Sequence, residues 1–447
     1  MRPAPVCLVL SAFLCAIGCS SSGENAGGGA GTGGAAASGG TFGGAGAGMG
    51  GVPGGAGGWT GGAGGAFGGA GGVSAGSGGV AGGAGGSSAG TGGLGMSGSG
   101  GASGGAGGVS VRIPAATAAT LREAGANASP PLLLGAAISG SGLGDKGYKN
   151  VAAAEFNYVT AENEMKWDAL EPNPGQFNWG AADNIVNWAT SNGMKVKGHT
   201  LVWHNQLPGW MSSMSGAAQV EQALRRHIEN VMGHFKDRVD TWDVVNEAVL
   251  TDSDTGVGNP RIRPSVFSNA LGADFLDLAF EIAHQQAPSA KLYYNDYSID
   301  ALNDKADFVY EMIKGMVERG VPIHGVGFQM HIGPPNNEAG GADVAANLKR
   351  FSELGLEVLI SEMDINRCSG QVTEQEQLTY YHDIVEACFK LPKCAGITFW
   401  GINDGRSWLN GWPGALCNNQ SSQALLFDDQ YQRKATYQQV MKALLGQ

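Results

Sequence analysis

Charged side chains are scarce in this sequence. They make up 15% of the 447 residues, and the formal net charge at pH 7 is −12. A chain of this composition has no basic patch that could bind the phosphates of a nucleic acid, and no basic face for an anionic membrane surface. We therefore expect no nucleic acid and no directly bound membrane as partners, whereas a neutral polymer fits this composition.

Cysteine is also scarce, and its spacing excludes the common metal sites. Of the seven cysteines, three lie close to the N-terminus, and the other four are Cys368, Cys388, Cys394 and Cys417. No CxxC spacing and no HExxH pattern occur, so we expect no metal ion and no other cofactor. An even set of cysteines in an exported protein indicates two disulfides, for which three pairings are possible.

Long hydrophobic runs are missing, with one short exception near the start. Arg2 is followed by the apolar run Val6–Ile17, which is too short to span a membrane as a mature helix but has the layout of a signal peptide. The segment 16–19 (AIGC) resembles a bacterial lipobox, in which Cys19 is acylated and becomes the new N-terminus, although Ala16 replaces the usual leucine. We predict a signal peptide over residues 1–18 and a lipid on Cys19. Ordinary secretion with cleavage nearby is the alternative.

Glycine, by contrast, is abundant and unevenly distributed. Residues 19–110 consist largely of Gly, with Ala, Ser and Thr supplying most of the rest. Such a segment cannot bury enough apolar surface to offset the conformational entropy lost on folding. We predict a disordered, flexible tether over 19–110 with a root-mean-square reach of roughly 50 Å, followed by one folded domain over 111–447. A tether that starts at an acylated cysteine would hold this exported domain at the cell surface or outer membrane.

The folded part alternates between short apolar segments and segments of helical periodicity. Candidate strands are 132–138, 156–160, 195–199, 241–246, 291–295, 325–330, 358–362 and 396–400, and helices are predicted at, for example, 217–235, 275–286, 304–319, 344–354, 374–388 and 435–444. Short apolar strands without strict alternation indicate a parallel sheet that is buried on both faces. This order predicts an α/β fold of the (β/α)8 TIM barrel type, although a doubly wound open sheet would show a similar pattern.

Polar and aromatic residues follow nearly every candidate strand. They occur in ENEMKW at 162–167, GHTLVWHNQ at 198–206, NE at 246–247, NDY at 295–297 and QMH at 329–331, and as Glu362, Asp364 and Trp400. This distribution favours the barrel, in which the C-terminal ends of all strands contribute to one cavity. It also suits a sugar, because hydroxyl groups need polar partners and the C–H faces of a pyranose ring pack on Trp and Tyr.

Two glutamates carry the chemistry that this cavity suggests. Glu247 ends the strand WDVVNE, and Glu362 ends the later strand VLISE. Paired carboxyl groups indicate glycoside cleavage, in which a protonated carboxyl group assists the leaving oxygen and an ionised one attacks the anomeric carbon. The apolar neighbours Trp242 and Val244 favour a raised pKa for Glu247, and polar neighbours favour an ionised Glu362, but the roles could be exchanged. Either glutamate alone could simply cap a helix or pair with an arginine.

The motifs ENEMKW, GHTLVWH, WDVVNE, YYNDY, GFQMH and SEMDI occur in this order between Phe156 and Asp428, and together they resemble the retaining endo-β-1,4-xylanases of glycoside hydrolase family ten. The resemblance implies Glu247 as the acid/base, Glu362 as the nucleophile, and xylan and xylo-oligosaccharides as substrates. It implies that Asn246 contacts the 2-hydroxyl of the sugar, and that His331 and Asp364 orient the nucleophile. The other substrate-binding residues that it implies are Glu162, Asn163, Lys166, His199, Trp203, Gln206, Tyr297, Gln329, Trp400 and Trp408.

The sequence departs from the pattern of this family at a few positions. Lys197 stands where arginine is usual, Asn403 replaces a common threonine, and Ala424 replaces a common proline. The resemblance assigns no role to the loop over residues 251–263 and no binding positions on the leaving-group side. The resemblance also selects a disulfide pairing, since a bridge like Cys388–Cys394 is common in the family, which leaves Cys368 to pair with Cys417.

Other classes of function fit parts of the sequence. A carbohydrate-binding protein could keep the barrel and lose catalysis, but both glutamates and their orienting partners are present. A structural surface protein built on the glycine-rich region would need aromatic periodicity or covalent-linking residues. His199, His204 and His331 could bind a metal, but their spacing favours hydrogen bonds to sugar or carboxylate. Among enzymes, the main alternative to a monomeric xylanase is a related barrel β-glycanase that cleaves cellulose or mixed-linkage glucan.

The change Cys19→Ser should release the protein from the membrane fraction or leave it unprocessed, because the acyl groups depend on the cysteine sulfur. Ser20 follows Cys19, so in a double-membrane bacterium we expect the outer membrane to hold the wild type. Fractionation and mass spectrometry of the N-terminus measure both points. The anchor hypothesis fails if the variant stays with the membranes as before and the wild-type N-terminus carries no acyl group.

Overall fold

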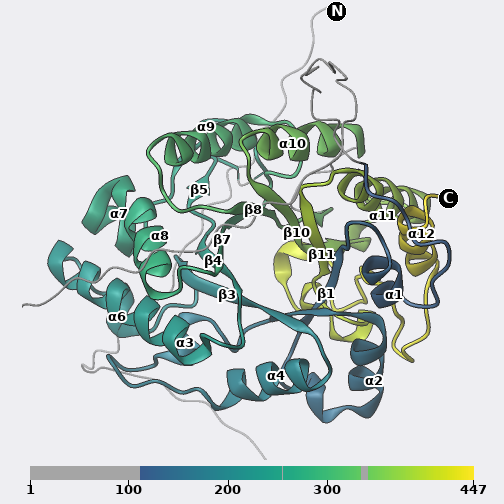
Figure 1. The fold of residues 1–447 in the computed structure, drawn as a ribbon, viewed down its shortest axis with the longest axis horizontal. Coiled ribbons are helices and arrows are strands. Elements are labelled where there is room, and N and C mark those ends of the chain that lie inside the picture. Colours follow the sequence, from purple (N-terminus) through teal and green to yellow (C-terminus); the bar gives the residue numbers. More distant parts are fainter. Residues whose placement is uncertain (1–110, 254, 334–340) are drawn as a thin grey trace, which may run out of the picture. The chain divides into compact units, whose positions relative to one another are not determined.

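The computed structural model describes residues 111–253, 255–333 and 341–447, which form a closed parallel barrel surrounded by helices (Figure 1). The barrel strands are β1 (Leu133–Ile138), β2 (Tyr158–Ala161), β3 (Lys195–Trp203), β4 (Thr241–Asn246), β7 (Lys291–Asp296), β8 (Gly325–Phe328), β10 (Glu357–Ile365) and β11 (Cys394–Phe399). They pair in the order β11-β1-β2-β3-β4-β7-β8-β10, and β10 also pairs with β11, which closes the sheet. The predicted (β/α)8 barrel is confirmed, and the open sheet is excluded.

The predictions for the N-terminal segment fall outside the residues that the structure describes. They are the signal peptide over 1–18, the lipidated Cys19 and the tether over 19–110. Within the described part of the chain, no helix is long and apolar enough to cross a membrane.

The helices lie around the barrel in chain order. They are α1 (Leu121–Ala126), α2 (Lys146–Glu155), α3 (Trp167–Leu170), α4 (Gly180–Ser191), α5 (Gly209–Ser212), α6 (Ala217–Phe235), α7 (Val266–Leu271), α8 (Phe275–Gln286), α9 (Asp304–Glu318), α10 (Gly341–Glu353), α11 (Glu374–Lys390) and α12 (Ala435–Leu444). The helices predicted from periodicity agree with α6, α8 and α12 at both ends, and with α9, α10 and α11 apart from small shifts. Three short strands were not predicted: β5 (Val249–Leu250) and β6 (Arg261–Ile262), which pair antiparallel, and β9 (His331–Ile332), which pairs with β10.

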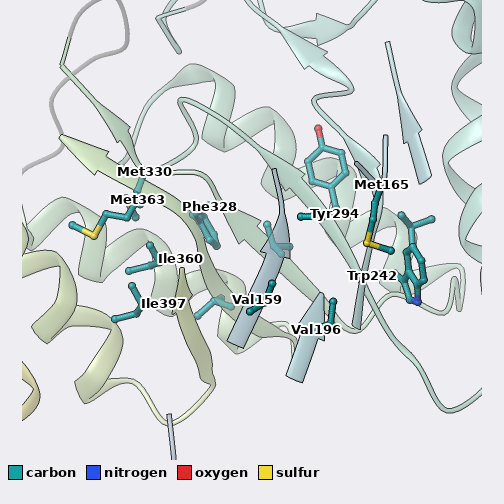
Figure 2. Close-up of a cluster of buried hydrophobic side chains, with 14 of the residues drawn as sticks. Val159, Met165, Val196, Trp242, Tyr294, Phe328, Met330, Ile360, Met363 and Ile397 are labelled. Carbon is teal, nitrogen blue, oxygen red and sulfur yellow. The ribbon is translucent and has the colours of Figure 1, made fainter. Parts of the chain in front are cut away.

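The apolar core lies between the barrel strands and the helices. Val159 on β2, Val196 on β3 and Trp242 on β4 are each 1% exposed and belong to one cluster of side chains from neighbouring strands (Figure 2). The amphipathic helix α6 contributes Val220 and Leu224 to the same cluster. Burying each such side chain stabilises the fold by about 1.5–3 kcal/mol. This layer therefore fixes the positions of the strands whose ends carry the polar residues.

Side chains that alternate with this layer fill the inside of the barrel. Tyr158, Tyr293 and Leu359 form a separate buried cluster, against which Leu133 packs. Gly396 approaches this cluster so closely that a Cβ atom would lie 2.9 Å from the backbone oxygen of Leu133. Because side chains occupy this part of the barrel, substrate can reach only the rim beyond it.

Two disulfides link segments of the chain that follow Glu362 of β10. Cys368 is bonded to Cys417, which ties the loop after β10 to the loop after β11, and Cys388 in α11 is bonded to Cys394 at the start of β11. This is the pairing that the family resemblance implies. Trp408 packs against a small buried cluster that contains Cys368 and Cys417, so the first bond supports one side of the site described below.

The two disulfides should differ in their effect on stability. Cys368 and Cys417 are separated by 49 residues and Cys388 and Cys394 by 6. A chain-entropy estimate predicts that alanine at both cysteines lowers the free energy of unfolding by about 4 kcal/mol for the long loop and about 2 kcal/mol for the short one. Urea denaturation of the two double variants and the wild type measures this difference. A larger loss for the short loop would contradict the estimate.

Candidate active site

A cleft of about 510 Å³ lies at the C-terminal ends of the barrel strands. It is lined by Glu162, Asn163, Lys166, His199, Trp203, His204, Asn205, Gln206, Asn246, Glu247, Arg263, Tyr297, Gln329, His331, Glu362, Trp400, Trp408 and Trp412. The predicted catalytic, supporting and substrate-binding residues all line this cleft except Asp364, which lies behind His331 and is 1% exposed. The fold therefore brings the predicted site together from strands that are distant in sequence.

The Glu247 carboxyl group lies among polar partners. Trp203 Nε1 donates a hydrogen bond to Oε2 at 2.7 Å, and the amide nitrogens of Asn246 and Gln329 donate to Oε1, both at 3.1 Å. The prediction that the strand neighbours of Glu247 surround its carboxyl group with apolar side chains is wrong. Trp242 points instead into the layer between the strands and the helices. Neighbours along a strand alternate between its two faces, so they do not describe the surroundings of a residue at its end.

The backbone of Glu247 adopts a left-handed conformation, with φ at 57°. This conformation costs a residue other than glycine about 1–2 kcal/mol. Both backbone groups of Glu247 are held: its N–H donates to the Asn295 carbonyl oxygen at 2.8 Å, and its carbonyl oxygen accepts from Arg263 Nε at 2.9 Å. Arg263 also donates to Tyr297 Oη at 2.6 Å. Neighbouring strands and the loop after β4 thus fix the direction of this carboxyl group.

Glu362 lies within β10 and is 4% exposed. Its Oε1 accepts a hydrogen bond from Asn295 Nδ2 at 2.7 Å, and its Oε2 lies 3.3 Å from His331 Nε2. The other ring nitrogen of His331 lies 2.9 Å from Asp364 Oδ1, and Trp408 Nε1 donates to Asp364 Oδ2 at 2.8 Å. His331 is therefore held between two buried carboxylates.

These contacts set the charges of His331 and Glu362. Burial disfavours a charged His331, but Asp364 and Glu362 outweigh burial and raise its pKa to about 10. Burial also disfavours an ionised Glu362, but the hydrogen bond from His331 and the charges of His199, His331 and Lys197 lower its pKa to about 2. At neutral pH an imidazolium thus lies beside an ionised Glu362.

A chain of amide groups connects the two glutamates. Asn295 Nδ2 donates both to Glu362 Oε1 and to Asn246 Oδ1, at 2.7 and 2.8 Å, and Asn295 Oδ1 accepts from Ser361 Oγ at 2.6 Å. Both amide hydrogens are used, so the orientation of this amide is fixed. Gln329 Nε2 then lies 3.4 Å from Asn246 Oδ1 and bonds Glu247. Asn295 was missing from the predicted site, although it lies in the motif YYNDY.

One wall of the cleft carries a cation over an aromatic ring. Lys166 Nζ lies 4.9 Å from the centroid of the Trp203 ring and donates to Asn163 Oδ1 at 3.0 Å. Gln206 Nε2 approaches the same oxygen at 3.4 Å. Burial raises the pKa of Glu162 to about 7, Lys166 opposes this rise and Glu164 adds to it. Glu162 can therefore donate or accept a hydrogen bond near neutral pH.

Another part of the cleft is lined by stacked aromatic rings. Trp408 stacks on Trp412, with ring centroids 4.8 Å apart and an angle of 26° between the planes. Trp412 and Arg263 line the cleft but were not predicted. The second tryptophan of SWLNGW could have indicated Trp412, whereas nothing local singles out Arg263. Among residues 111–253, 255–333 and 341–447, no group of three or more His, Cys, Asp or Glu side chains could hold a metal ion.

Comparison with known proteins identifies the family. Residues 121–443 match glycosyl hydrolase family 10. The chain belongs to this family. Endo-1,4-beta-xylanase B of Thermotoga neapolitana is 40% identical over 294 residues, which are 65% of this chain and 81% of that protein. This family 10 member is thus a glycoside hydrolase.

Solved structures of the family share this fold. Native xylanase 10B from Thermotoga maritima has a TM-score of 0.66 and 38% identity, and the match covers 73% of this chain and 98% of that one. Xylanase 10B from Thermotoga petrophila RKU-1, solved in complex with xylobiose, has a TM-score of 0.65 and 37% identity at the same coverage.

The pH dependence of stability should report the charge on His331 of this family 10 hydrolase. Its pKa is raised from 6.5 to about 10 in the folded state, so its contribution is complete below pH 6.5 and is lost as the pH rises through about 10. The free energy of unfolding of the wild type should fall between these values, and His331→Asn should lack this part of the slope.

Urea denaturation at several pH values measures the slope. His382→Asn is the matched control, because His382 lies partly exposed on α11, and it should keep the wild-type slope. Equal slopes for the wild type and His331→Asn would show that His331 has no raised pKa.

Proposed function

We propose that this family 10 glycoside hydrolase is an endo-1,4-β-xylanase that hydrolyses internal β-1,4-xylosidic bonds with retention of configuration. The observation that carries the proposal is the pair of carboxyl groups in one cleft with different partners. Glu362 is ionised beside an imidazolium, whereas the side chains that donate hydrogen bonds to the Glu247 carboxyl group are the neutral Trp203, Asn246 and Gln329. Two carboxyl groups with unequal surroundings suit the separate roles of nucleophile and acid/base.

In the first step a carboxylate oxygen of Glu362 attacks the anomeric carbon and the glycosidic bond breaks. The proton of Glu247 moves to the leaving oxygen, which yields a covalent glycosyl-enzyme and a shortened chain. In the second step Glu247 removes a proton from water, the oxygen of this water attacks the same carbon, and the bond to Glu362 breaks. Two displacements restore the β configuration.

The surrounding residues would hold the sugar during both steps. Asn246 is in reach of the 2-hydroxyl group, because its amide lies between the two glutamates in the amide chain. His331 and Asp364 keep Glu362 oriented and ionised. The other residues that we assign to substrate binding are Glu162, Asn163, Lys166, His199, Trp203, Gln206, Tyr297, Gln329, Trp400 and Trp408.

The proposal extends to the substrate and to the location of the enzyme. Xylan and xylo-oligosaccharides are the substrates, which is supported by the xylanase relatives and by the xylobiose complex of one of them. The enzyme works without a cofactor and as a monomer. It is exported, and its N-terminal segment anchors it through Cys19 or is cleaved to release it.

Release of reducing ends from xylan, carboxymethylcellulose and lichenan tests the substrate class. We expect xylan to be the preferred substrate and short xylo-oligosaccharides to appear early, as internal cleavage requires. Preferred hydrolysis of carboxymethylcellulose or lichenan would replace the xylanase by a β-glucanase. If none of the three polymers is hydrolysed, the result favours a carbohydrate-binding protein without catalytic activity.

Substitutions of the two glutamates should change the activity in different ways. Glu362→Ala removes the attacking oxygen, so hydrolysis of every substrate should be lost. Glu247→Ala removes only proton transfer, typically worth 10²–10⁴-fold, so an aryl xylobioside with a good leaving group should still form the intermediate. Azide should then restore turnover of Glu247→Ala and yield a β-glycosyl azide, as NMR can show. An α-glycosyl azide, or azide rescue of Glu362→Ala in place of Glu247→Ala, would overturn the role assignments.

A further inference from the structure

A buried ion pair lies inside the barrel and is not used by the mechanism above. The side chains of Lys197 on β3 and Asp243 on β4 are 0% exposed, and Lys197 Nζ lies 2.6 Å from Asp243 Oδ2. Their strand neighbours Val196 and Trp242 point into the outer apolar layer (Figure 2). Because side chains alternate along a strand, Lys197 and Asp243 face the barrel axis.

The ion pair reaches the cleft through His199. His199 Nδ1 lies 2.9 Å from the same oxygen, Asp243 Oδ2. The imidazole lines the cleft and meets the Trp400 ring edge to face, with centroids 5.3 Å apart. Thr200 Oγ1 donates to the Asp243 carbonyl oxygen at 2.9 Å, which holds the two strands together beside this contact. A continuous series of contacts therefore connects Lys197, through Asp243 and His199, to the wall of the cleft.

The hydrogen bonds of Asp243 are distributed differently from those of an ion pair that stabilises the fold. Both Lys197 and His199 converge on Oδ2, whereas Oδ1 of Asp243 has no hydrogen-bond partner among the described residues. Buried ion pairs add little net stability, since loss of hydration offsets the attraction, unless further hydrogen bonds satisfy both partners. This arrangement leaves one oxygen unsatisfied and uses the other to hold a ring.

We propose that Lys197 is a positioning residue of the cleft. It holds Asp243, and Asp243 in turn holds the His199 imidazole in the orientation in which this ring contacts the sugar. The inference rests on the proposed function, in which His199 contacts substrate. The lysine ammonium group is compact and approaches Asp243 Oδ2 from one side. The second lone pair of this oxygen therefore stays available to His199.

The charge of Lys197 also reaches Glu362. Asn295 from β7 and His331 from β9 contact Glu362, whereas His199 and Lys197 from β3 interact with it electrostatically. Lys166 interacts electrostatically with both Glu362 and Glu247. Burial works against the ionised form, and Lys197 is one of the cations that lower the pKa of Glu362 despite it. Loss of this cation should move the acid limb of the activity profile to higher pH.

A double-mutant cycle between Lys197→Met and His199→Ala tests the proposal. With an aryl xylobioside, Lys197→Met alone should lower kcat/KM on the order of 10- to 100-fold, as loss of a supporting contact does. In the His199→Ala background the same change should have little further effect, because the ring that Lys197 positions is gone. Lys197→Arg keeps the cation and should restore the acid limb that Lys197→Met shifts.

The matched control is Lys195→Met. Lys195 lies two residues earlier on β3 and pairs with Asp240 at 3.1 Å, but both side chains are more than half exposed. This variant should keep the wild-type kcat/KM and pH profile. If Lys197→Met does not fold, Asp243→Asn takes its place in the double-mutant cycle, since it weakens the contact between Lys197 and His199 that runs through Asp243.

Additive effects of Lys197→Met and His199→Ala would overturn the proposal, as would an unchanged kcat/KM and acid limb in a folded Lys197→Met variant. The proposed function fails separately, through a wild type that does not hydrolyse xylan.

Discussion

The hydrogen-bonded contact of His331 with Glu362 and Asp364 sets the charges in this cleft, and the proposed chemistry depends on it. Three ionisable groups are buried there within hydrogen-bond distance, and burial disfavours the charge on each. Their mutual attraction outweighs burial, so His331 carries a proton and Glu362 does not. Without the imidazolium, two buried carboxylates would repel each other and one would take up a proton. The cation thus keeps Glu362, the attacking group of the proposed mechanism, ionised in a place that excludes most water.

The barrel makes this arrangement possible by separating two kinds of side chain. Alternation along each strand sends one set outward, where it packs against the helices, and the other set inward. The outer layer is apolar and fixes the strands, as the burial of Val196 and Trp242 shows. The inner set can therefore be polar near the rim without loss of the core. Asn295 illustrates the result, since its amide joins Glu362 to Asn246 and is itself held by Ser361.

The strands and helices could be predicted because their signals are local. Apolar runs and helical periodicity located every barrel strand, and the motifs at strand ends located the cleft. The surroundings of Glu247 could not be inferred in this way, because its hydrogen-bond donors Trp203 and Gln329 come from other strand ends. Arg263 was missed for the same reason: it holds the Glu247 backbone only because the β5–β6 hairpin folds the loop back. Such contacts depend on chain segments that meet only in the folded barrel.

The central claim is that Glu362 forms a covalent bond to the sugar. The most direct measurement is to incubate the enzyme with an activated 2-deoxy-2-fluoro-xylobioside, whose fluorine slows the second step, and to map the labelled peptide by mass spectrometry. The account predicts one equivalent of label on Glu362, release of the label on addition of a xylo-oligosaccharide acceptor, and no label on Glu362→Ala. Label on Glu247, or hydrolysis of unmodified substrate without any covalent intermediate and with initial formation of the α-anomer, would contradict it.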